Sequence, residues 1–93
     1  MFENILRLLR DAVETGAIIF TPHAQDEMNE DELLTFDLEQ CVLTGVIIER
    51  QWDDSFKDWK YIVEGESADE APIVVVVKLD QKGKIVFITT YCI

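Results

Sequence analysis

One histidine and a few cations within apolar segments are the side chains of this sequence that could do chemistry. His23 directly follows Thr21 and Pro22, a pair that is typical of a helix start. In the first turn of a helix, the partial positive charge of the N-terminus favours a neutral imidazole, which can serve as a general base near pH 7. The alternative is structural: the ring packs or hydrogen-bonds beside Pro22 and ties the helix to the sheet.

Two lysines, Lys60 and Lys78, interrupt apolar segments with the pattern of strands, and Arg50 does the same in an earlier segment. If these segments form one sheet, the three cations could make a basic stripe that stabilises the charge developing in phosphoryl transfer. The same side chains could instead extend from strand ends and neutralise nearby acids. Strand register decides between these arrangements, and the sequence does not fix it.

The last apolar segment carries two further candidates, Thr89 and Tyr91. Because they are two residues apart, they share one face of a strand, while Thr90 and Cys92 point to the other face. Tyr91 could donate a proton or stack on a base, or it could be a core residue whose hydroxyl reaches the surface. The sequence thus predicts His23, Tyr91, Lys60 and Lys78 as catalytic residues, and Arg50 and Thr89 as substrate-binding residues.

Helical spacing of apolar residues dominates the first half of the chain. Residues 2–15 form an amphipathic helix that Gly16 ends, and a second helix begins at Thr21 and Pro22 and ends near Asn29. A third helix runs from Thr35 to Gly45. The segment 17–20 between the first two helices is expected to be a short extended connector.

The second half alternates with a period of two and predicts four strands, at 46–52, 59–65, 72–79 and 84–93. Short turns join them, so an antiparallel arrangement is favoured. The expected fold is a single α+β domain over residues 1–93, with the helices on one face of a four-stranded antiparallel sheet. The last two strands are apolar on both faces, which predicts a homodimer or a small partner protein as a second cover.

The net charge of −11 repels phosphate and therefore disfavours RNA and anionic membranes as partners. The acidic run from Asp26 to Glu32 lacks the glycine and the alternation of a calcium loop. It fits a solvated helix face, or a surface that recruits a basic partner. With one histidine and no CxxC pair, neither a metal nor a cofactor is expected.

Charged residues interrupt the apolar positions of the N-terminal segment, which breaks any signal-peptide core, and no apolar run reaches the length of a membrane span. Cys41 and Cys92 share no motif spacing. We therefore expect reduced thiols and a cytoplasmic location.

Separated blocks of the chain also match a known family pattern: HAQDEM, LTGVIIE, WKY, VVVK and ITTY. From Phe20 to Tyr91 the chain resembles the domain of unknown function 4258, a family of small bacterial and archaeal proteins. That family is similar to the compact ribonuclease-like toxins of the RelE and barnase type, and its members resemble partners of small zinc-ribbon antitoxins.

The resemblance implies a RelE-like fold and a toxin–antitoxin-type protein that cleaves RNA without a metal. His23 or Tyr91 would transfer protons, and the cations would hold the phosphate. Relatives often carry arginine in the HA–x–x–R–M helix, where this chain has Asp26 and Glu27, so a positive charge useful for gripping phosphate is missing. The alternative is a non-catalytic protein-interaction module on the same scaffold, whose acids set the choice of partner.

Overall fold

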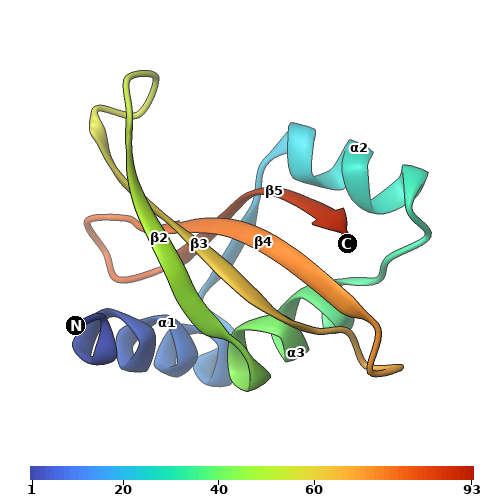
Figure 1. Ribbon diagram of the computed structural model, residues 1–93. Helices are drawn as coiled ribbons and strands as arrows, with labels where there is room; N and C mark the ends of the chain where they lie inside the picture. The colour runs from blue at the N-terminus through green and yellow to red at the C-terminus, as the bar shows by residue number, and fades with distance from the viewer.

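The computed structural model describes residues 1–93 and contains three helices and five strands (Figure 1). The helices are α1 (Glu3–Thr15), α2 (Pro22–Glu30) and α3 (Thr35–Thr44). The strands are β1 (Ile18–Phe20), β2 (Val46–Asp53), β3 (Asp58–Glu66), β4 (Pro72–Leu79) and β5 (Ile85–Cys92). They form one sheet in the order β1-β5-β4-β3-β2. The predicted α+β class, the three helices and the antiparallel pairing of the four longer strands are confirmed.

The sheet itself corrects the prediction, because it is five-stranded and mixed rather than four-stranded and antiparallel. The segment expected to be a connector forms β1, whose residues pair in parallel with Ile85, Val86 and Phe87 of β5. The Phe20 ring stacks on the Phe87 ring with centroids 5.0 Å apart. The physical reason is that β5 would otherwise leave one edge of its backbone groups without hydrogen-bond partners, and β1 supplies them.

All three helices contribute to one hydrophobic core on a single face of the sheet. Leu9 and Val13 of α1, Ala24 and Met28 of α2, and Leu38, Cys41 and Val42 of α3 meet Val63, Ile73, Val75, Val77, Ile85 and Phe87 of the sheet. Thr21 begins α2 as predicted, since its Oγ accepts a hydrogen bond from the Ala24 amide at 3.1 Å. The same hydroxyl donates to the Ile88 carbonyl oxygen at 2.9 Å and so fastens α2 to β5.

The other face of the sheet, here called the open face, has no helix over it. Ile62, Val74 and Val76 nevertheless pack together there with Ile88, and each of the first three is buried. Neighbouring side chains of the same face therefore bury this second apolar cluster within one chain. The interior residues of β4 do not by themselves require a partner chain, and the homodimer or small partner stays a prediction.

Candidate functional site

Four of the six candidate residues lie on the open face. Thr89 pairs with Val76 and Tyr91 pairs with Val74, which places both side chains beside the open-face cluster. Lys78 follows Val76 by two residues and Lys60 precedes Ile62 by two, so both lysines share that face. The prediction that Thr89 and Tyr91 share one face is confirmed, and buried Thr90 lies on the helix side, where its Oγ donates to the Val74 carbonyl oxygen at 3.0 Å.

Arg50 lies on the opposite face from the two lysines. It pairs with Tyr61, which belongs to the helix-side core, so the guanidinium points to that side of the sheet. There it lies over the Trp59 ring, 4.1 Å from the ring centroid. The structure therefore does not assemble the stripe of three cations and leaves Lys60 and Lys78 as a pair.

Both open-face lysines are held by carboxylates of the β2–β3 hairpin. Lys60 Nζ lies 3.0 Å from Asp53 Oδ2, and Lys78 Nζ lies 3.4 Å from Asp58 Oδ2. The hydrogen bond from Lys60 is the main reason why the pKa of Asp53 is lowered. Lys78 also packs over the Phe56 ring at 5.2 Å. A phosphate at either lysine would have to displace a carboxylate, so the geometry matches the interpretation in which these lysines neutralise acids.

The candidate catalytic residues do not converge on one point. Tyr91 lies beside Val74 and Lys78 is four residues further along β4, a separation of roughly 13 Å at the usual rise of a strand. The His23 side chain is 65% exposed, and its Nε2 lies 3.6 Å from Glu27 Oε1. His23 makes no ion pair with any other residue. Proton transfer needs groups within about 3 Å or one bridging water, and this arrangement does not supply them.

A different surface combines exposed apolar side chains with a hollow. Leu34 and Phe36, at the start of α3, are 71% and 55% exposed. Thr35, between them in sequence, lines a hollow of about 290 Å³ between α2 and α3, which Leu34 and Phe36 themselves do not line. The other lining residues are Phe20, Gln25, Met28 and Asn29. We call Leu34, Phe36 and this hollow the α2–α3 surface. The signal in the sequence was the apolar pair Leu34 and Phe36 within a strongly acidic stretch.

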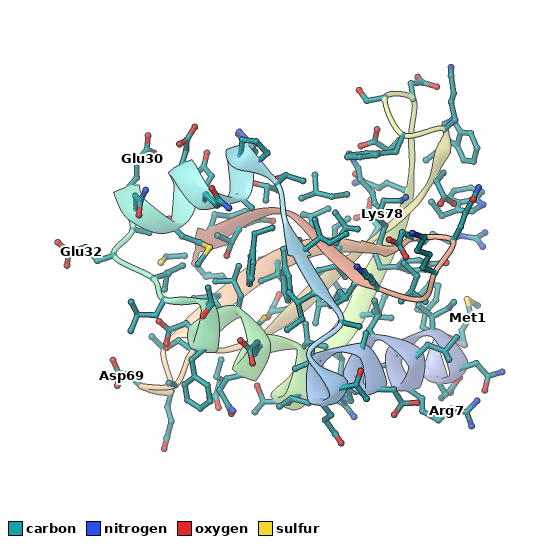
Figure 2. The ribbon with its side chains drawn as sticks, turned by 180° about the vertical axis from the view of Figure 1, so that it is seen from behind. Met1, Arg7, Glu30, Glu32, Asp69 and Lys78 are labelled. Carbon is teal, nitrogen blue, oxygen red and sulfur yellow. The ribbon has the colours of Figure 1, made fainter.

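The charge around this surface is of one sign. No lysine or arginine occurs between Arg10 and Arg50, or between Lys60 and Lys78. Figure 2 shows Glu30, Glu32 and Asp69 at one end of the molecule, with Lys78 and Arg7 toward the other. We call the first of these the acidic end. Its carboxylates belong to α2, the α2–α3 connector, the first half of α3, the end of β3 and the β3–β4 turn: Asp26, Glu27, Glu30, Asp31, Glu32, Asp37, Glu39, Glu66, Asp69 and Glu70.

Asp37 joins two segments of the acidic end. Its Oδ2 accepts a hydrogen bond from the Leu34 amide at 2.8 Å, and its Oδ1 accepts one from the Ala68 amide at 3.0 Å. The first bond satisfies an amide at the start of α3, where Leu34 has no side-chain acceptor of its own. The second holds the β3–β4 turn against α3, so one carboxylate fixes both Leu34 and the turn that carries Asp69.

Most of this chain matches the model of a known family. The model of the family described as "Domain of unknown function (DUF4258)" matches residues 20–92. The chain belongs to the DUF4258 family. No curated protein and no solved structure matches it.

The match to DUF4258 covers β1 from its last residue, together with α2, α3 and the four longer strands. It includes all six candidate residues and the α2–α3 surface, and it leaves α1 outside. None of the helices of this DUF4258 protein is long and apolar enough to cross a membrane. Its His, Cys, Asp and Glu side chains form no group of three or more that could hold a metal ion.

Proposed function

We propose that this DUF4258 protein is a non-catalytic protein-interaction module that binds a basic partner through the α2–α3 surface. The observation that carries the proposal is the position of Leu34 and Phe36: two exposed apolar side chains beside a hollow, in a part of the molecule whose charged groups are all carboxylates. A partner segment with an apolar anchor and flanking Lys or Arg residues is complementary to such a surface.

The energetics of this surface favour binding over chemistry. Burying a mostly exposed leucine or phenylalanine side chain contributes roughly 1.5–3 kcal/mol, enough for two anchors to support a specific contact. The surrounding carboxylates would raise the association rate for a cationic partner and reject anionic ones. By contrast, the two lysines that could hold phosphate are already paired with Asp53 and Asp58.

The test uses a synthetic helical peptide of lysine and leucine in amphipathic order as the probe. Isothermal titration should show binding to the native protein that weakens as salt is added. Leu34→Lys and Phe36→Lys should each weaken it at least tenfold, since each loses about 1.4 kcal/mol or more through the lost apolar contact and the added positive charge. Ile48→Lys is the matched control, because Ile48 is also an exposed apolar residue but belongs to β2. Equal weakening by all three variants would refute a specific α2–α3 site.

A second candidate function, RNA cleavage without a metal by a toxin-type protein, is favoured by one observation. Lys60, Lys78, Thr89 and Tyr91 share the open face, where cations and a hydroxyl could meet a phosphate. Under this proposal an antitoxin-like small protein would be the partner that covers the open face.

RNA cleavage has its own test. Expression would arrest growth, and purified protein would cleave RNA in the presence of a chelator. His23→Ala and Tyr91→Phe would abolish cleavage while leaving the thermal midpoint nearly unchanged. Intact RNA after incubation with native protein would remove this candidate and leave the interaction module.

A further inference from the structure

The outer edge of β2 is the longest unpaired strand edge of the molecule. β2 ends the sheet order, so its backbone groups on the side away from β3 have no partner strand. The other edge strand, β1, has only three residues. Ile48 is an extra residue in the β2–β3 ladder, which makes the regular part of β2 begin at Glu49. Exposed strand edges are ready to pair with another strand.

The β2–β3 hairpin extends beyond the body of the molecule (Figure 1). One face of the hairpin carries exposed aromatic rings. Trp52 and Trp59 are 48% and 39% exposed, and their rings meet edge to face at 5.3 Å. Tryptophan and arginine are the residues most often found at the energetic centres of interfaces. An arm with Arg50 and two tryptophans on one face therefore has the composition of a contact surface.

Arg50 and Asp54 are the two charges nearest Trp52 on this arm that make no ion pair within the chain; Glu49 and Lys57 make none either. Arg50 lies over the Trp59 ring and makes no ion pair with a carboxylate. Asp54 accepts a hydrogen bond from Trp52 Nε1 at 3.1 Å and makes no ion pair with a cation. Both charges lie close to Trp52, one on each side of it along the chain.

We propose that two copies of this chain pair through the outer edge of β2, antiparallel and about a two-fold axis at Trp52. Such an axis places each residue opposite its counterpart at an equal distance on the other side of Trp52. Gln51 then faces Asp53 of the second copy, the two Trp52 side chains face each other, and Arg50 faces Asp54, the first residue of the hairpin turn. Arg50 and Asp54 are matched twice, and the two β2 strands join over the short segment around Trp52.

The charge distribution restricts how a second copy can occupy this edge. Each chain carries a net charge of −11, so a homodimer is stable only if the acidic ends stay apart. α2, which carries much of the acidic end, packs on β5, whereas β2 is at the far edge of the sheet. Pairing near the end of the arm points the two bodies in opposite directions and separates their acidic ends. This inference concerns a different surface from the proposed function and stands independently of it.

Analytical ultracentrifugation of charge-reversal variants tests this pairing. The native chain should dimerise as its concentration rises toward about 1 mM. Arg50→Asp and Asp54→Arg should each raise the dimer Kd at least about tenfold, because each turns two attractions into two repulsions. The double variant should restore dimerisation. Arg7→Asp makes the same charge change on α1 and should leave the Kd unchanged.

Cysteine cross-linking tests the position of the axis, in a Cys92→Ser background that removes the exposed native thiol. Trp52→Cys should form a disulfide-linked dimer on oxidation, because residues facing each other across antiparallel strands have Cβ atoms about 5 Å apart. Gln51→Cys, one residue away, should not. A native chain that stays monomeric, with this edge free for a strand of another protein, would overturn the proposal, as would a double variant that remains monomeric or cross-linking at Gln51→Cys instead of Trp52→Cys.

Discussion

Replacing Asp37 tests how the acidic end is held together. This carboxylate accepts hydrogen bonds from the Leu34 and Ala68 amides through separate oxygens. Asp37→Ala removes both bonds, whereas Asp37→Asn keeps one oxygen as an acceptor. The three states of this side chain therefore form a graded series in which two, one or no acceptor is present.

The size of the effect follows from the number of bonds lost. Each bond is solvent-accessible and contributes about 1 kcal/mol to the free energy of unfolding, the typical net value for a hydrogen bond in a protein. Asp37→Ala should therefore cost about 2 kcal/mol, and Asp37→Asn about half of that. For a chain of this size, a loss of about 2 kcal/mol lowers the thermal midpoint by roughly 10 °C.

Urea unfolding followed by tryptophan fluorescence measures these differences, with Asp26→Ala as the control. Asp26 is an exposed carboxylate of α2 that makes no hydrogen bond through its side chain, so its loss should change stability by less than about 0.5 kcal/mol. An Asp37→Ala variant that is no less stable than Asp26→Ala, or an Asp37→Asn variant as unstable as Asp37→Ala, would contradict this role of Asp37.

Four further predictions concern other parts of the fold. Gly65→Ala should lower the free energy of unfolding by at least about 2 kcal/mol, because a Cβ there would overlap the Cys41 carbonyl oxygen where α3 crosses β3. An unchanged midpoint of urea unfolding would contradict this. A thiol reagent should label one cysteine in the native protein, exposed Cys92, and two in urea; rapid labelling of both in the native state would show that Cys41 is not buried. Burial raises the pKa of Cys41 to about 12. The stability contributed by the protonated thiol is therefore fully present below about pH 9 and is lost as the pH rises toward 12. Cys41→Ala should remove this pH dependence. Asp80→Ala should destabilise the β4–β5 turn, whose Lys82 and Lys84 amides it binds at 2.9 and 2.8 Å, and faster amide exchange in that turn would report it.

The three helices, the four longer strands and their antiparallel pairing could be predicted from the sequence, while β1 and the strand register could not. Helix starts and stops at Thr21 and Gly16, and the alternation of the four longer strands, are local signals that the structure confirms. β1 was missed because three apolar residues after a helix look like a connector. Only the free edge of β5, which is distant in sequence, makes them a strand.

The candidate site shows the same limit. That Thr89 and Tyr91 share a face follows from their spacing alone. The position of Arg50 depends on how β2 is registered on β3, with Ile48 as an inserted residue, and no local pattern reveals that insertion. The acids that hold Lys60 and Lys78 are visible in the sequence of the segment 53–58. Only the geometry of the hairpin shows which lysine each acid pairs with. The α2–α3 surface emerged only when the exposure of Leu34 and Phe36 was known.

An amide chemical-shift map of the labelled protein, titrated with the lysine–leucine peptide and separately with a single-stranded RNA, tests the central claim most directly. We expect the peptide to shift the amides around Leu34, Phe36 and the hollow between α2 and α3, and the RNA to shift none. If RNA shifts the amides around Lys60, Lys78 and Tyr91 and the peptide shifts none on the α2–α3 surface, the proposed interaction module is contradicted.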